Sequence, residues 1–250
     1  MSNVLIVIPA RYGSSRLPGK ILKPLGGKPV IQHVYEACKN TGLGRVLIAT
    51  ESPVVVQACA QFGAEAVLTS PACQSGTDRV FEVAQYQPEE LIINVQGDEP
   101  FIKTATVTAV AQLLQKDASC DIATAVFARK DDEQVDNPNI VKAVLAKDGR
   151  ALYFSRSRVP YKRETTEENF KVPYWHHCGI YGYRRAALER FVALPESPLE
   201  KLERLEQLRA LEAGMTIKCV EICPSGPAID TEQDLAAAEA YYLKSTAHSH

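Results

Sequence analysis

Apolar residues in this chain gather in short continuous runs. Residues 4–8 (VLIVI) are all apolar, and residues 91–95 (LIINV) are nearly so. Such runs are too short to span a membrane and are typical of strands buried on both faces. Three further runs, at residues 46–50, 66–69 and 121–126, predict additional strands.

Helical stretches separate these strands. They are predicted at residues 30–40, 53–62 and 104–116, and Pro53 suits the first position of its helix. Strands that alternate with helices form a mostly parallel sheet with helices on both faces. The first half of the chain therefore predicts an α/β fold.

The pattern changes in the second half. Two extended runs, residues 140–146 and 150–155, flank Asp148-Gly149, which is a strong signal for a hairpin with a type I′ turn. A polar stretch at residues 162–171 indicates an exposed loop or a segment ordered by a partner. Four more elements are predicted: strands at residues 178–183 and 216–223, a helix at 198–213 ended by Gly214, and a closing helix at 231–243. On the helix at 198–213, Glu200 and Arg204 are expected to form an ion pair four residues apart.

Length and charge narrow the classes of protein. The 250 residues fit one α/β domain, residues 1–250, with an excursion at about residues 136–185. A net charge of −2 leaves no basic surplus for nucleic acid or an anionic membrane, so any anion site must be local. With neither a signal peptide nor a membrane span in the sequence, we expect a cytoplasmic protein. The seven cysteines form no C-x-x-C pair, and we expect reduced thiols.

The loop after the first strand carries the clearest candidate chemistry. Arg11, Arg16 and Lys20 lie among small residues, with no acidic residue in the loop. Small residues allow backbone N–H groups to approach an anion, and three cations neutralise several phosphate charges, so we predict a triphosphate site at the carboxyl end of a central strand. A Walker A loop is excluded because Gly13 and Gly19 enclose five residues, and no G-x-G-x-x-G indicates a dinucleotide cofactor. The alternative is an ordinary polar loop with solvated arginines.

Two carboxylates are candidate ligands for a metal ion that would also bind the predicted triphosphate. Asp98 follows the strand at residues 91–95, on the same sheet edge as the loop, and Asp230 follows the last strand. Mg²⁺ takes one or two carboxylates together with phosphate oxygens and water. The alternatives are structural: Asp98 would cap the next turn, and Asp230 or Thr231 would cap the closing helix.

Two further groups of residues are candidates for binding. Residues 75–79 form a small-residue turn into a helix, whose N–H groups would meet a base or phosphate, while Thr77 or Asp78 would cap the helix in the competing interpretation. In the second half, arginine suits a carboxylate, and glutamine, histidine and tyrosine suit sugar hydroxyls. The pair His176-His177 lacks a third ligand at metal spacing, which argues against zinc.

Seven motifs, in chain order, resemble those of the 3-deoxy-manno-octulosonate cytidylyltransferases, or CMP-Kdo synthetases. They are IPARYGSSRLPGK, QSGTDR, NVQGDEP, ALYFSRSRVP, HCGIYGYR, LEQLRALEAG and IDTEQDL. The resemblance extends from residue 4 to about residue 240. Acylneuraminate cytidylyltransferases typically carry Lys where this chain has Arg16, and ALYFSR, GIYGY and LEQLR together indicate the Kdo branch.

The resemblance implies a Rossmann-like nucleotidyltransferase (GT-A-like) fold, usually homodimeric, with the excursion serving the sugar site and the dimer. It implies transfer of CMP from CTP to Kdo, with Mg²⁺, for lipopolysaccharide synthesis in Gram-negative bacteria. The nucleotide-binding residues that it implies are Ala10, Arg11, Gly13, Ser14, Arg16, Lys20, Gln74, Ser75, Gly76, Arg79 and Gln96. The sugar-binding residues would be Arg156, His177, Tyr181, Glu206 and Gln207. Asp98 and Asp230 would hold magnesium, and Lys20, Arg16 and Asp98 would be catalytic.

Two alternatives stay open at this stage. One is a cytidylyltransferase for another acid sugar, such as 8-amino-Kdo. The other is a non-catalytic nucleotide-sensing protein on the same fold, which would be expected to have lost the cations or the metal carboxylates.

Overall fold

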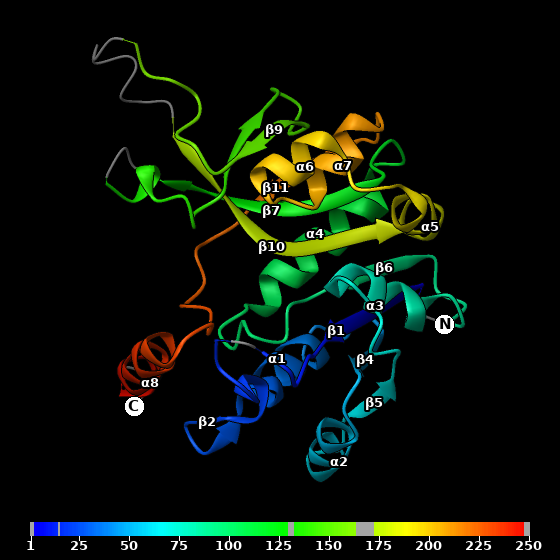
Figure 1. Cartoon of the computed structure of the whole chain (residues 1–250), viewed down its shortest axis with the longest axis vertical. Coiled ribbons are helices and arrows are strands. Elements are labelled where there is room, and N and C mark those ends of the chain that lie inside the picture. The colour runs from blue at the N-terminus through cyan, green and yellow to red at the C-terminus, as the bar shows by residue number, and fades with distance from the viewer. Residues whose placement is uncertain (1–2, 15, 130–132, 164–172, 248–250) are drawn as a thin grey trace. The chain divides into compact units, whose positions relative to one another are not determined.

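The computed structural model describes residues 3–14, 16–129, 133–163 and 173–247, and the chain divides into two compact units (Figure 1). The first unit combines residues 1–108 with residues 224–250, and the second comprises residues 109–223. The single-domain organisation stays a prediction. Most of the predicted polar stretch at residues 162–171 lies outside the described residues.

The first unit is built on four parallel strands. They lie in the order β6 (Leu91–Asn94), β1 (Val4–Pro9), β4 (Arg45–Thr50) and β5 (Glu65–Leu68). Every residue of β1 is buried, because β6 and β4 pair with its two edges and helices cover its faces. The predicted strands of this half are confirmed, and so is the parallel arrangement.

Helices α1 (Val30–Lys39), α2 (Pro53–Gln61), α3 (Gly76–Ala84) and α8 (Glu232–Ala247) complete the first unit. A short 3-10 helix, η1 (Lys20–Leu22), and a small hairpin, β2 (Pro24–Leu25) with β3 (Lys28–Pro29), follow the loop after β1. The sequence pattern did not predict the hairpin.

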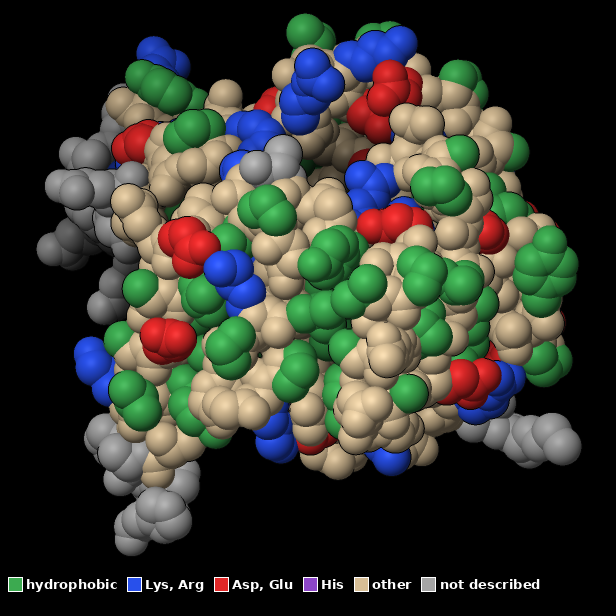
Figure 2. Space-filling model, turned by 60° about the horizontal axis from the view of Figure 1, so that its bottom comes forward, with side chains coloured by type: hydrophobic (Ala, Val, Ile, Leu, Met, Phe, Trp, Pro, Cys, Tyr) green, Lys and Arg blue, Asp and Glu red, His purple; other side chains and the backbone are tan. Residues whose placement is uncertain are grey.

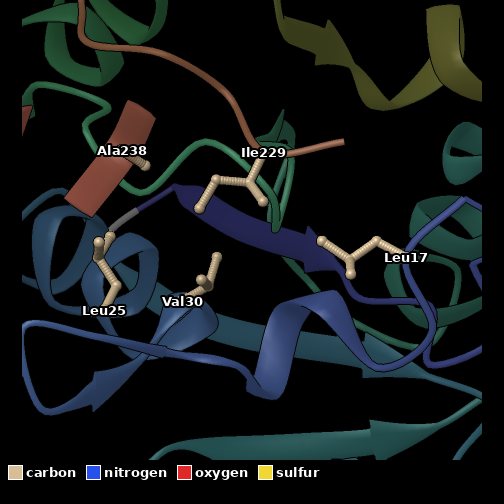
Figure 3. Packing of buried hydrophobic residues seen from close by; sticks show 5 residues of the cluster. All are labelled: Leu17, Leu25, Val30, Ile229 and Ala238. Carbon is tan, nitrogen blue, oxygen red and sulfur yellow. The ribbon is translucent and has the colours of Figure 1, made fainter. Parts of the chain in front are cut away.

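A hydrophobic cluster joins the two ends of the chain within this unit. Figure 3 shows its buried members, Leu17, Leu25, Val30, Ile229 and Ala238. Leu17 belongs to the loop after β1, whereas Ile229 and Ala238 come from the last 25 residues. Burial of these side chains therefore fixes residue 230 near a loop that lies more than 200 residues earlier.

The second unit holds a mixed sheet. Strand β7 (Ile122–Arg129) pairs in parallel with β11 (Ile217–Glu221) and antiparallel with β10 (Tyr174–Arg184). Strand β10 also pairs with β8 (Lys142–Leu145), which pairs with β9 (Ala151–Ser155). Four helices belong mainly to this unit: α4 (Thr104–Lys116), α5 (Arg185–Ala193), α6 (Pro198–Glu203) and α7 (Gln207–Glu212). A 3-10 helix, η2 (Glu133–Asp136), is also present.

The hairpin between β8 and β9 is confirmed, but its predicted turn type is wrong. The N–H of Ala146 donates to the carbonyl of Arg150, and Gly149 N–H donates to the carbonyl of Ala146. Three residues therefore form the loop, and among them only Gly149 has a positive φ, of 81°. A type I′ turn requires positive φ at both central residues, and Asp148 does not adopt it.

The helix predicted at residues 198–213 is two helices. Arg204 adopts a left-handed conformation with φ 54° and ψ 47°, which ends α6 before α7 begins. The expected ion pair of Glu200 with Arg204 is also wrong. Glu200 instead accepts two hydrogen bonds from Arg209, at 2.7 and 2.8 Å, and Gly214 ends α7 with φ 71°.

The distribution of surface charge and the state of the cysteines match what the composition predicts. Figure 2 shows acidic and basic side chains interspersed with hydrophobic ones over the face in view. All seven cysteines lie outside disulfide bonds, in agreement with the expected reduced thiols. Within the described ranges, every helix is too short or too polar to cross a bilayer.

Candidate active site

A cleft of about 350 Å³ in the first unit gathers most of the predicted nucleotide-site residues. It lies at the carboxyl ends of β1 and β6, as expected for parallel strands. The predicted residues that line it are Arg11, Gly13, Ser14, Arg16, Lys20, Gly76, Gln96, Asp98 and Asp230. The loop after β1, the segment after β6, the start of α3 and residue 230 thus meet around one space.

Lys20 is the centre of this cleft. Its Nζ lies 2.6 Å from Asp98 Oδ2 and 2.7 Å from Asp230 Oδ1, and its side chain is 11% exposed. Arg16 Nη2 approaches the other oxygen of Asp230 at 3.1 Å. Because both carboxylates contact one ammonium group, the two acidic residues lie within a few ångström of each other.

Backbone contacts hold these three side chains in place. Gly19, with φ 65°, turns the chain so that Lys20 begins η1. The N–H of Ile229 donates to the carbonyl of Asp98 at 2.9 Å, which ties residue 230 to the segment after β6. Asp230 does not cap α8. Thr231 does so, because its Oγ1 accepts from Asp234 N–H while Asp234 Oδ2 accepts from the N–H of Thr231.

The electrostatics keep Lys20 charged. Burial disfavours the ammonium, but Asp98 and Asp230 outweigh it and raise the pKa of Lys20 above its ordinary value. Burial and the neighbouring Asp98 charge raise the pKa of Glu99 to about 7. In the cleft, the charges of Lys20 and Arg16 therefore lie in direct contact with those of Asp98 and Asp230.

The donor set suits a hard divalent cation that also binds phosphate. Two converging carboxylates are the usual protein contribution to such a site, and phosphate oxygens and water supply the other ligands. Among the described residues, no group of three or more His, Cys, Asp or Glu side chains gathers that would hold a metal without such additional ligands.

The backbone of the loop after β1 is less free to bind an anion than its small residues indicate. The carbonyl of Tyr12 accepts from the N–H groups of Ser14 and Gly19, at 3.1 and 3.0 Å. Glu51 Oε1 accepts from the N–H groups of Tyr12 and Gly13, at 2.9 and 3.4 Å. At Tyr12, Gly13, Ser14 and Gly19, backbone N–H groups are therefore already engaged, and the side chains of Arg11, Arg16 and Lys20 are the remaining candidates to meet an anion.

The remaining predicted nucleotide residues lie beside the cleft. Gln74 and Arg79 line an adjoining cavity of about 270 Å³, which shares Arg11 and Gly13 with the first. Ala10 is fully buried and donates its N–H to the carbonyl of Ala49 at 2.8 Å.

The start of α3 has a structural cap. Ser75 Oγ accepts from Asp78 N–H, and Asp78 Oδ2 accepts from the N–H of Ser75, so Ser75 and Asp78 form a capping box. Thr77 is buried. The competing structural interpretation of this turn is thus correct in kind, with Ser75 as the capping residue.

In the second unit, His177 and Tyr181 lie on one face of β10. Their partners on β7 are Val126 and Thr124, and a β-bulge separates the two positions. The hydroxyl of Thr124 donates to the carbonyl of Ile180 at 2.8 Å, so His177 Nε2, at 2.9 Å, must donate to that hydroxyl. Burial lowers the pKa of His177 to about 3, and the imidazole is neutral.

The other predicted sugar residues surround the break between α6 and α7. Burial, with smaller contributions from Tyr183 and Glu206, raises the pKa of Tyr181 well above its ordinary value. Gln207 is 6% exposed, and its Nε2 has no hydrogen-bond partner within the described structure.

Arg156 is engaged with backbone carbonyls. Its guanidinium donates to the carbonyls of Glu203, Pro138 and Arg204, at 2.6, 2.9 and 3.2 Å. In this arrangement Arg156 holds the segment between α6 and α7, and a direct role in binding the sugar stays a prediction.

Comparisons with known proteins identify the family. The cytidylyltransferase family model matches residues 5–217. A 3-deoxy-manno-octulosonate cytidylyltransferase from Elusimicrobium minutum is 61% identical over 241 residues, which cover 96% of this chain and 98% of the relative. The chain belongs to the 3-deoxy-manno-octulosonate cytidylyltransferase family.

Two more proteins of this family support the assignment. A 3-deoxy-manno-octulosonate cytidylyltransferase from Rhodopirellula baltica is 48% identical over 93% of this chain and 96% of its own. The solved structure of a CMP:2-keto-3-deoxy-manno-octonic acid synthetase complexed with CTP superposes with a TM-score of 0.92, at 42% identity, covering 97% of this chain and 99% of that one. The predicted nucleotidyltransferase fold is thereby confirmed.

One acidic residue near this cleft, Glu51, was not singled out from the sequence. Glu51 directly follows β4, so it lies at the same sheet edge as the loop after β1 and as Asp98. The strand-end rule that singled out Asp98 applies equally to Glu51 and would have found it.

Proposed function

We propose that this chain transfers CMP from CTP to the anomeric hydroxyl of Kdo, with Mg²⁺, and releases pyrophosphate. The single observation that carries this proposal is the meeting of Lys20 with Asp98 and Asp230, at 2.6 and 2.7 Å. These residues come from three distant parts of the sequence, and together they supply the charges that nucleotidyl transfer needs. A non-catalytic protein on this fold would need these residues only for stability, so the loss of turnover in the variants below separates the two interpretations.

In the proposed reaction, the anomeric oxygen of the sugar attacks the α-phosphorus in line and pyrophosphate departs. Lys20 and Arg16 neutralise the charge that builds on the phosphoryl oxygens, so positioning and electrostatics supply most of the acceleration. Asp98 and Asp230 would hold the metal. When bound, that metal would lower the pKa of the attacking hydroxyl and offset phosphate charge.

On the sugar side, the second unit offers donors and acceptors with fixed roles. Neutral His177 and Tyr181 share one face of β10, while Glu206 and Gln207 begin α7. The unpartnered amide nitrogen of Gln207 is suited to donate to a hydroxyl or carboxylate of the sugar acid. These assignments support a polyhydroxylated acid as the acceptor.

The test is a pyrophosphate-release assay with CTP, UTP and ATP, each combined with Kdo, 8-amino-Kdo and an acylneuraminate. We expect release with CTP and Kdo. Release with 8-amino-Kdo alone would change the acceptor and keep the reaction class, whereas no release with any pair would refute the proposal.

Two variants test the assigned residues. Lys20→Ala and Asp98→Asn should each lower kcat by at least about 10²-fold, because each removes a charge that faces the reacting phosphate. Circular dichroism and thermal unfolding would verify the fold, and near-normal turnover in either variant would refute its role.

The homodimer and the cytoplasmic location are part of the same proposal. Light scattering coupled to size-exclusion chromatography would measure the mass in solution, and a monomer at micromolar concentration would refute the dimer.

A further inference from the structure

Glu51 links the loop after β1 to the body of the first unit. Its carboxylate Oε1 accepts from the N–H of Tyr12 at 2.9 Å and from the N–H of Gly13 at 3.4 Å. We call residues 10–20 the phosphate loop; of these, Ser15 lies outside the described part. Among the described backbone groups of this loop, these two N–H groups sit between the cation Arg11 and the turn that leads to Arg16.

A carboxylate beside a site for triphosphate is unfavourable unless its charge is neutralised. Arg79 does this. Its Nη1 lies 3.2 Å from Glu51 Oε2, and its side chain is almost completely buried. The same nitrogen donates to Thr69 Oγ1, so the guanidinium is anchored to the segment after β5. Glu51 and Arg79 thus form a nearly neutral pair that joins β4, α3 and the phosphate loop.

The loop has few other restraints at this point. Tyr12 and Gly13 are exposed, and a Cβ added at Gly13 would meet no atom within 4 Å. Arg11 itself is exposed and donates to the carbonyl of Cys73. Without the carboxylate, the peptide groups of Tyr12 and Gly13 would be held mainly by the hydrogen bonds to the Tyr12 carbonyl.

We propose that Glu51 is a positioning residue that fixes the phosphate loop in the conformation that receives the triphosphate of CTP. It acts through the backbone of Tyr12 and Gly13, and it sets where Arg11 and Arg16 present their charges. This inference rests on the proposed function, since it takes CTP as the ligand of the cleft. It assigns Glu51 no contact with the reacting atoms.

The experiment compares Glu51→Ala and Glu51→Gln with a matched control, Glu65→Ala. Glu65 pairs with Arg45 at 3.3 Å, and its side chain is 61% exposed, so its removal makes the same change of charge away from the loop. Calorimetry would measure the Kd of CTP, and competition would measure the inhibition constant of tripolyphosphate. Steady-state kinetics would then give KM for CTP and for Kdo separately.

We expect Glu51→Ala to weaken CTP and tripolyphosphate binding by about 10-fold or more, because the loop loses a charged acceptor. Glu51→Gln keeps an oxygen that accepts from Tyr12, and it should restore part of the affinity. KM for Kdo should stay within about twofold, and Glu65→Ala should match the unmodified chain, since exposed ion pairs contribute little.

Two results would overturn the inference. One is CTP affinity within twofold of the unmodified chain in Glu51→Ala. The other is a variant in which kcat falls, KM rises for both substrates and the melting temperature drops together, which would show that Glu51 only supports the fold. Failure of the proposed function would look different, because the unmodified chain would then release no pyrophosphate from CTP with any acid sugar.

Discussion

Replacement of Lys20 by methionine tests the central charge arrangement most directly. Methionine has a similar length and no charge, so Lys20→Met leaves Asp98 and Asp230 facing each other with only Arg16 beside them. The variant loses two charge-assisted hydrogen bonds, at 2.6 and 2.7 Å. Hydrogen bonds to charged groups contribute about 1.5–3 kcal/mol each when buried.

Exposure reduces that figure for one of the two bonds. The side chain of Asp230 is 45% exposed and that of Asp98 is 29% exposed, so the Asp230 bond contributes under about 1 kcal/mol. We therefore expect Lys20→Met to lower the free energy of unfolding by about 1.5–4 kcal/mol. The matched control is Lys23→Met, which breaks an exposed pair with Glu232 and should cost less than about 0.5 kcal/mol.

Urea denaturation with and without MgCl₂ is the assay. In Lys20→Met the two carboxylates have lost the ammonium that competes for them, so added Mg²⁺ should stabilise this variant more than the unmodified chain. A site of millimolar affinity would return about 1.4 kcal/mol at a tenfold excess of Mg²⁺ over its Kd. A variant as stable as Lys23→Met, or one that does not respond to Mg²⁺, would refute the shared position of the ammonium and the metal.

Three other predictions concern stability. Arg209→Met should lower the free energy of unfolding by about 3–5 kcal/mol, because it removes the cation that faces the buried Glu200 carboxylate. Adding Glu200→Gln should recover part of the loss in urea unfolding. Since the pKa of His177 is lowered to about 3, the unfolded chain binds the proton first, and this residue should contribute a fall in stability of about 1.4 kcal/mol per pH unit below about pH 6.5. His177→Gln should make that fall shallower between about pH 6.5 and pH 5, and an unchanged slope would contradict the buried neutral imidazole. Gly26→Ala should lower the free energy of unfolding by more than about 2 kcal/mol, because φ is 55° and the new Cβ would lie 2.2 Å from an aromatic ring of α8. The control Gly27→Ala, with φ 82° and open space around the new Cβ, should lower it by about 1 kcal/mol. Equal melting temperatures of the two variants would refute this difference.

The sequence predicted the first unit well because local pattern and fold agree there. The apolar run at residues 4–8 became β1, which ends at Pro9, and the run at residues 91–95 became β6 (Leu91–Asn94). Residues at the carboxyl ends of parallel strands share one edge, which is why Asp98 and the phosphate loop were expected to meet.

The second unit was predicted less well because tertiary contacts override local pattern there. Leucines at every third position continue through Arg204, so the sequence gives no sign of a break. In the structure Arg156 donates to the carbonyls of Glu203 and Arg204, which helps to offset the cost of a left-handed conformation at a non-glycine residue. Helix α5 (Arg185–Ala193) was missed altogether, because it directly follows β10 without a turn residue between them.

The position of Asp230 was the hardest to anticipate. It contacts Lys20 across 210 positions of sequence, and a rival role as a helix cap was equally open. Burial of Ile229 beside Leu17 and Leu25 decides between them, and such a contact between distant segments has no local signature.

The joining of the two chain ends in the first unit has a consequence for biosynthesis. Because translation delivers the amino end first, the strands and the cationic loop exist long before Ile229 and Asp230 emerge. A truncated product that stops short of residue 229 lacks both the buried side chain of Ile229 and the carboxylate of Asp230. Prematurely terminated chains should therefore be catalytically silent.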